Sequence, residues 1–178
     1  LLLLSAKVRS RILPALAICV NGPIHLDSAS IKLTQGLNRI YDHRFVLELK
    51  KYVKDNHAQA YPKVHKVKDL REFDEVYTAP VGGFENRAHY YQTCSAMSYL
   101  SEIEIPTVML TAEDDPFVDY QDYKKAKLSP SIIMHIEKHG GHMGYLTKNG
   151  LGYGRWLDHA LKVYLEAATA KFFKSSLT

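Results

Sequence analysis

Three short hydrophobic runs along the chain predict three β-strands that are buried on both faces. The runs are Leu16 to Val20, Pro106 to Thr111 and Ile132 to Ile136, and all three contain β-branched residues. Each run is followed by glycine, proline or polar residues, which are typical of turns. Near-continuous hydrophobic runs of this length are typical of strands in a parallel sheet, so we expect an α/β fold.

Two further segments are expected to form helices. Tyr120 to Lys127 lies between the second and third predicted strands and is long enough for one crossover helix, which predicts a right-handed βαβ unit. The end of the chain predicts an amphipathic helix that covers the sheet. Its hydrophobic positions are Leu157, Ala160, Leu161, Tyr164, Leu165 and Ala168.

Residues 21–105 separate the first two predicted strands and are too many for a simple crossover connection. Their hydrophobic residues are spaced as in helices: Phe45, Val46, Leu49, Tyr52, Val53, Val67, Leu70 and Phe73. We therefore expect a core formed by residues 1–26 and 101–178, with a helical insertion or cap over residues 27–100. Aromatic residues are dense from Phe84 to Leu100. Two roles stay open for them: lining a pocket, or filling the junction between the insertion and the sheet.

Composition and charge exclude several classes of protein. The chain has 178 residues and 46% hydrophobic content, enough for the core of one ordinary domain. The chain has 23 Lys and Arg against 19 Asp and Glu. This excess is too small to predict the broad basic surface of a nucleic-acid-binding protein. The densest basic run, Lys63 to Arg71, alternates with hydrophobic residues and predicts the exposed face of a short helix. The longest apolar stretch, Leu13 to Val20, is shorter than the ~20 residues of a membrane-spanning helix.

The two cysteines lie in different predicted segments. Cys19 is inside the first hydrophobic run, and Cys94 is in the aromatic part of the predicted insertion. We expect two buried free thiols rather than a disulfide, which favours a reducing compartment and a cytoplasmic protein.

Acidic and histidine residues follow the second and third predicted strands. Asp114 and Asp115 come after the second strand, and His139 and His142 come after the third. Neighbouring parallel strands lie ~4.8 Å apart, and their carboxyl ends share one edge of the sheet, so side chains from the two loops can meet. A carboxylate that holds an imidazole in this way is half of a hydrolytic triad.

Several short motifs occur in a fixed order along the chain. They are Leu70-Arg71-Glu72-Phe73-Asp74, Thr78-Ala79-Pro80, Gly83-Phe84, Tyr90-Tyr91, Ser95, Ile105-Pro106-Thr107, Ala112-Glu113-Asp114-Asp115-Pro116-Phe117 and His139-Gly140-Gly141-His142-Met143-Gly144-Tyr145. Together they resemble the YheT-like branch of the α/β hydrolases. The resemblance implies the C-terminal half of an α/β-hydrolase fold, with parallel strands flanked by helices. It also implies an esterase or acylglycerol lipase that acts on small ester or lipid substrates and needs no cofactor.

The same resemblance implies roles for two residues. The catalytic acid is the aspartate directly before the proline, Asp115, and the base is the second histidine of His-Gly-Gly-His, His142. Asp114 is the alternative acid, although we prefer it as a turn residue, and His139 is expected to orient its neighbours or face solvent. The acid-before-base order matches that of α/β hydrolases.

The nucleophile of such a triad is missing from this sequence. No serine has glycine two residues before and two residues after it, so the Gly-x-Ser-x-Gly elbow is absent. Leu1 to Leu4 read as part of the helix that follows this elbow. We therefore expect the serine and the oxyanion-hole donors in an upstream half of the same polypeptide, and an inactive chain without them.

Other functions were weighed on the same residues. Gly150 to Gly154 is similar to a dinucleotide-binding loop, but its last glycine comes one residue early and no second strand with a ribose-binding acid follows. Asp114, Asp115, His139 and His142 are residue types that hold divalent metal ions, although the resemblance assigns two of them to a proton relay. A hydrolase-fold chain can also be a binding or interaction module without catalysis, and the upstream sequence would discriminate because such a module needs no serine.

Overall fold

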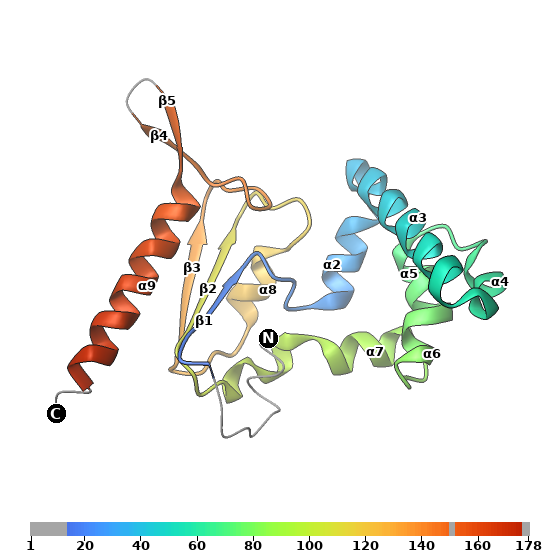
Figure 1. Cartoon of the computed structure of the whole chain (residues 1–178), viewed down its shortest axis with the longest axis horizontal. Helices are drawn as coiled ribbons and strands as arrows, with labels where there is room; N and C mark the ends of the chain where they lie inside the picture. The colour runs from blue at the N-terminus through green and yellow to red at the C-terminus, as the bar shows by residue number, and fades with distance from the viewer. Residues whose placement is uncertain (1–13, 150–151, 176–178) are drawn as a thin grey trace. The chain divides into compact units, whose positions relative to one another are not determined.

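The computed structural model describes residues 14–149 and 152–175 of the chain. Three strands form a parallel sheet in the order β1-β2-β3 (Figure 1): β1 (Ala17–Val20), β2 (Thr107–Ala112) and β3 (Ile132–Glu137). The three predicted strands and their parallel arrangement are confirmed. All six residues of the central strand β2 are buried, which explains why its sequence is a continuous hydrophobic run. The segment Leu1 to Leu4, read above as helix, lies outside the described residues.

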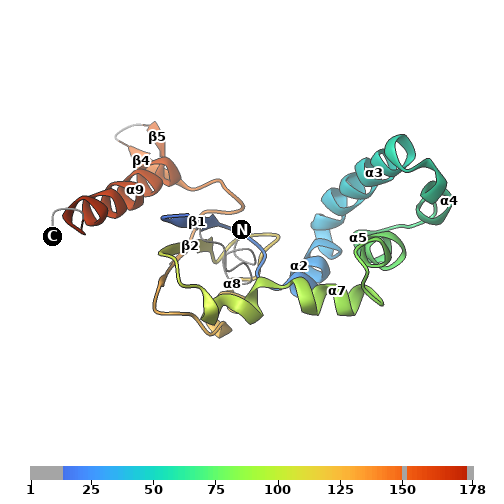
Figure 2. The same cartoon turned by 60° about the horizontal axis from the view of Figure 1, so that its bottom comes forward.

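The predicted crossover and C-terminal helices are both present. α8 (Tyr120–Lys125) connects β2 to β3, and α9 (Trp156–Ser175) ends the chain. Figure 2 shows α9 on one side of the sheet, where Leu157 packs in a buried cluster with Leu110 and Ala112 of β2. The predicted hydrophobic stripe of this helix was wrong at Leu165, whose side chain is 52% exposed.

A short antiparallel hairpin between β3 and α9 was not predicted. β4 (Leu146–Asn149) pairs with β5 (Gly152–Arg155), and the residues between them are not described. Part of the glycine-rich segment Gly150 to Gly154 is therefore strand rather than a loop that opens a helix. Glycine is depleted in strands, so local propensity did not indicate this hairpin.

Helices make up most of residues 26–102, as the hydrophobic spacing predicted. The longer helices are α2 (Leu26–Leu33), α3 (Arg39–Asn56) and α7 (Arg87–Cys94); α4 (Tyr61–Val64), α5 (Leu70–Phe73) and α6 (Ala79–Val81) are short. A buried cluster of five side chains holds α3, α4 and α5 together: Val46, Val53, Val64, Val67 and Phe73. Several of them belong to the hydrophobic pattern that predicted the helices.

The basic run Lys63 to Arg71 covers the end of α4, the connection to α5 and the start of α5, instead of lying on one helix. α4 ends at Val64, and Asp69 begins α5 by accepting a hydrogen bond from the Glu72 amide at 2.8 Å. The alternation is nevertheless real, since Val64 and Val67 are buried while the intervening basic residues are exposed. The prediction of a single helix was wrong because α4 ends at Val64 and Asp69 is the N-cap of a new helix, α5.

The described chain separates into two compact units. The first contains residues 14–22, 98–115 and 124–175, and the second contains Pro23–Met97 and Pro116–Tyr123. The first unit holds the sheet, the β4-β5 hairpin and α9, and the second holds the helices α2 to α7. The role of residues 27–100 as a cap on a hydrolase core stays a prediction.

Two other expectations concern membranes and cysteines. Within residues 14–149 and 152–175, no helix is long and apolar enough to cross a bilayer. Cys19 and Cys94 are both thiols, and each is partly buried rather than fully buried as expected.

Candidate active site

The carboxyl edge of the sheet brings together an aspartate and a histidine. Asp115 lies three residues beyond the end of β2, and its side chain is completely buried. His142 lies in the turn after β3, with 37% of its side chain exposed. Its Nδ1 atom is 3.0 Å from Oδ2 of Asp115. Because β2 and β3 are neighbours with Ala112 opposite Glu137, their following loops start side by side, and the two predicted residues meet as expected.

The turn that presents His142 depends on its glycines. The carbonyl of Gly140 accepts hydrogen bonds from the amides of Gly144 at 2.8 Å and Tyr145 at 3.0 Å. A Cβ atom at Gly140 would overlap the ring of Tyr145, and Gly141 adopts a φ of 53°, which favours glycine. Met143 also has a positive φ, 76°, directly after the histidine. The tight turn therefore fixes the backbone on both sides of His142.

The second aspartate, Asp114, holds the same turn through its backbone. Its Oδ1 atom accepts hydrogen bonds from the amides of Gly140 at 2.9 Å and Gly141 at 2.8 Å. Partial desolvation raises the pKa of Asp114, but the bonds from Gly141 and Gly140 outweigh it and leave the pKa below its usual value. Its Oδ2 atom lies 3.6 Å from Nδ1 of His139, whose side chain is 87% exposed. Asp114 thus contacts the turn and His139, whereas Asp115 contacts His142.

Sequence reasoning missed one further polar residue at this edge, Asn21. Asn21 follows β1, is only 2% exposed, and has a φ of 48°. Its Nδ2 atom donates to Oδ2 of Asp115 and to the carbonyl of Gly141, each at 2.7 Å. In the sequence, Asn21-Gly22-Pro23 was only a turn signal. The clue that could have found it is its position, since β1 ends at the same edge as β2 and β3.

Tyr145 completes this buried network. Its hydroxyl donates to Oδ1 of Asn21, and its ring stacks on Trp156 with centroids 5.7 Å apart. Burial raises the pKa of Tyr145 to about 12, and the negative charges of Asp115 and Asp114 act in the same direction. The phenol is therefore neutral across the range in which most proteins are stable.

This shift predicts a specific alkaline instability in the full-length protein. A tyrosine in an unfolded chain titrates near pH ~10, so Tyr145 stabilises the fold below that pH and the contribution is lost as pH rises towards about 12. The loss amounts to roughly 2 kcal/mol. Phenylalanine cannot ionise, so the free energy of unfolding of Tyr145→Phe lacks this pH dependence. Urea unfolding should therefore show a smaller difference in free energy of unfolding between the parent and Tyr145→Phe at pH 11 than at pH 8. A difference that stays constant would contradict the prediction.

Comparison with known proteins places the chain in a family. It is 34% identical over 164 residues to "Putative esterase YheT" of Escherichia coli, a match that covers 85% of this chain and 48% of that protein. The chain belongs to the YheT-like branch of the α/β hydrolases. No protein-family model matches it.

Two yeast proteins are also similar to this chain. It is 40% identical over 88 residues to "Medium-chain fatty acid ethyl ester synthase/esterase 2" of Saccharomyces cerevisiae, covering 49% of the chain and 20% of that protein. It is 30% identical over 116 residues to "Monoacylglycerol lipase" of the same yeast, covering 63% and 26%. The YheT-like chain therefore spans about half the length of its bacterial relative and less of the yeast proteins.

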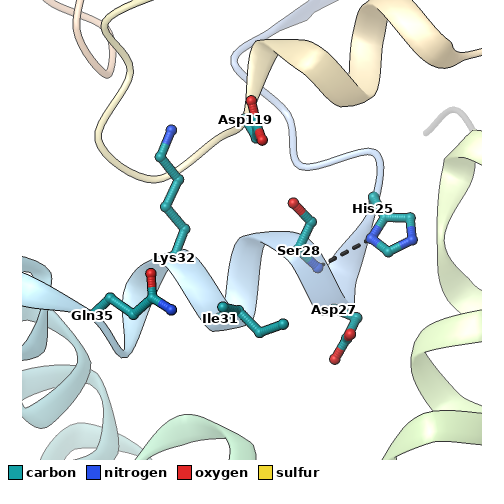
Figure 3. A pocket seen from close by; sticks show the side chains of 7 residues that line it. All are labelled: His25, Asp27, Ser28, Ile31, Lys32, Gln35 and Asp119. Atoms are coloured by element: carbon teal, nitrogen blue, oxygen red, sulfur yellow. Dashed lines mark hydrogen bonds between the residues drawn. The ribbon is translucent and has the colours of Figure 1, made fainter.

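The helical unit of the YheT-like chain has a pocket of its own. It measures 590 Å³ and is lined by seven residues: His25, Asp27, Ser28, Ile31, Lys32, Gln35 and Asp119. Figure 3 shows Lys32 and Ser28 extending from α2 towards the loop of Asp119. Lys32 donates to the carbonyl of Val118 at 2.8 Å, and Asp27 pairs with Arg71 at 2.7 Å. These charged groups already have protein partners, so the pocket indicates no particular ligand.

The metal-binding interpretation was tested on the described part of the chain. There, no group of three or more His, Cys, Asp and Glu side chains is arranged to hold a metal ion. The aromatic residues of the helical unit do not line the pocket above. Tyr91 is instead buried, and its hydroxyl donates to Oδ2 of Asp74 at 2.7 Å, which favours the packing interpretation for this residue.

Proposed function

We propose that the full-length protein is a carboxylic ester hydrolase with a Ser-Asp-His triad whose serine lies upstream of residue 1. In this proposal His142 is the general base and then the general acid, and Asp115 orients it. The observation that carries the proposal is the 3.0 Å contact between His142 Nδ1 and the buried carboxylate of Asp115 at the carboxyl edge of a parallel sheet.

The geometry supports a defined path for the proton. Because Nδ1 of His142 faces Asp115, Nε2 is the nitrogen that would take the proton of the serine hydroxyl. The serine oxygen then attacks the ester carbonyl, and the imidazolium returns the proton to the departing alcohol. Water attacks the acyl-enzyme by the same route and releases the carboxylic acid. The Asp115 carboxylate stabilises the positive charge that His142 carries in both steps.

The names of the relatives support esters of carboxylic acids as substrates. They include an esterase, a medium-chain fatty acid ethyl ester synthase/esterase, a monoacylglycerol lipase and, in mouse, "Phospholipase ABHD3". Two of these names, the fatty acid ethyl ester synthase/esterase and the monoacylglycerol lipase, refer to acyl ester bonds, which need no cofactor for their hydrolysis by a triad. We propose an ester or acylglycerol substrate, with residues 27–100 as the cap beside it.

We also propose a reducing, cytoplasmic location for this protein. Its support is that Cys19 and Cys94 are both thiols.

The proposal is tested with the full-length protein and a fluorophosphonate probe, which reacts with activated serines. We expect labelling of a serine upstream of residue 1, hydrolysis of p-nitrophenyl butyrate, and neither property in the isolated 178-residue chain, because nucleophile and oxyanion donors would both be missing. A full-length protein that neither takes the label nor hydrolyses acyl esters would contradict the proposal and favour a binding module.

A further inference from the structure

We infer that Asn21 is a positioning residue for the Asp115–His142 pair, holding the carboxylate and the histidine turn in one arrangement. This inference rests on the proposed function, because it names a further residue of the same site. Asn21 comes from β1, Asp115 follows β2, and the histidine turn follows β3. A single amide therefore links the ends of all three strands.

The side-chain amide of Asn21 donates both to the carboxylate of Asp115 and to the backbone next to His142. Oδ2 of Asp115 is 2.7 Å from Nδ2 of Asn21 and 3.0 Å from Nδ1 of His142. The same carboxylate oxygen thus faces both groups, and rotating the carboxylate would weaken both contacts. The other donor of Nδ2 is directed to the carbonyl of Gly141 at 2.7 Å, the residue just before His142. Asn21 restrains the acid and the backbone of the base together.

Only one orientation of the Asn21 amide satisfies its neighbours. Asp115 Oδ2 and the Gly141 carbonyl are both acceptors, and both require the NH₂ end of the amide. The hydroxyl of Tyr145 donates to the opposite end, Oδ1. A flipped amide would place its oxygen against two acceptors, and Asn21 is only 2% exposed, so the unpaired polar groups would be costly. Tyr145 therefore fixes the amide, and the amide fixes Asp115.

The residue type at position 21 follows from the same contacts. An aspartate of the same shape would set a second carboxylate against Asp115 and a carbonyl oxygen, where it would be repelled. The backbone φ of 48° is one that asparagine tolerates better than most residues. Asparagine satisfies the backbone and the hydrogen bonds at once.

The first test compares Asn21→Gly with a control asparagine in the full-length protein. Glycine removes the amide but keeps the positive φ accessible. We expect kcat for p-nitrophenyl butyrate to fall about 10- to 100-fold with KM changed less than about twofold, as for a catalytic group displaced by a fraction of an ångström. Asn38 is the matched control, since its Nδ2 also bridges two backbone carbonyls, Lys32 at 3.0 Å and Pro116 at 2.6 Å, within the helical unit. Asn38→Ala should keep kcat within about twofold.

A double-mutant cycle then separates positioning from a general effect on folding. If Asn21 acts through Asp115, Asn21→Gly should cause no further loss of kcat in an Asp115→Ala background. Losses that multiply would overturn the inference. Should Asn21→Gly not fold, Tyr145→Phe is the second probe, because it keeps the ring against Trp156 and removes only the hydroxyl that orients the amide. A kcat unchanged in Tyr145→Phe would then overturn the inference.

A spectroscopic measurement keeps this inference separate from the proposed function. The proton on Nδ1 of His142 should give a low-field NMR resonance in the parent protein and in Asn38→Ala. In Asn21→Gly we expect it to move upfield or broaden, because Asp115 Oδ2 is no longer held against Nδ1. A parent that hydrolyses no ester refutes the proposed function alone, whereas an unchanged resonance in Asn21→Gly overturns the positioning role.

Discussion

His142→Ala in the full-length protein should lower kcat/KM for ester hydrolysis by about four orders of magnitude while the protein remains folded. The expected loss is that of a triad histidine, since the serine hydroxyl would no longer have a group to take its proton. Folding should survive because the imidazole is 37% exposed and lies in a turn rather than in a core cluster. Steady-state kinetics and thermal unfolding of the same preparation measure the two effects.

His139→Ala is the matched control for this experiment. It removes an imidazole three residues away in the same turn, but that side chain is 87% exposed and lies beside Asp114 rather than Asp115. We expect kcat/KM to stay within about threefold of the parent, as for most exposed positions. Equal losses in both histidine variants, or near-normal activity in His142→Ala, would refute the role assigned to His142.

Asp115→Asn should also lower kcat/KM by about four orders of magnitude. The substitution keeps the shape of the side chain but removes the charge that would stabilise the imidazolium, and its NH₂ group can no longer accept from His142 Nδ1. Oδ2 of Asp115 also accepts from Asn21, so the new amide has to satisfy two donors with one oxygen. The same kinetic assay, with unfolding as a check, measures the loss.

Asp114→Asn is the corresponding control on the neighbouring carboxylate. The amide oxygen can still accept from Gly140 and Gly141, so the turn keeps its two backbone hydrogen bonds while the charge is lost. We expect less than about a tenfold loss of kcat/KM, because Asp115, the carboxylate that contacts His142, keeps its charge. A large loss in Asp114→Asn with a small one in Asp115→Asn would exchange the roles of the two aspartates.

The sheet could be predicted because its signal is local in the sequence. Each strand is a hydrophobic run closed by turn residues, and burial on both faces needs such runs wherever the strands pair. A meeting of the acidic loop after β2 with the histidine loop after β3 followed from the same argument, since residues after neighbouring parallel strands share one edge. The helices of the second unit were also local, with Val46 and Val53 at the spacing of one buried face.

What the sequence missed depends on contacts between distant residues. Asn21 is 94 residues from Asp115 and 124 from Tyr145, and nothing next to it distinguishes a turn residue from the centre of a buried network. The β4-β5 hairpin contains glycines that local propensity assigns to loops. The two helices within the basic run were missed because the cap at Asp69 interrupts an alternation that reads as continuous.

The sequence by itself determined the parallel strands, the helical segments and the edge where the acidic and histidine residues gather. These follow from hydrophobic periodicity and strand direction, which are properties of short segments. Only the tertiary structure decided which aspartate contacts His142. It also showed that Asn21 donates to Asp115 and that Tyr145 donates to Asn21. The physical reason is that buried polar groups must be satisfied together, and their partners come from strands that the chain brings together only on folding.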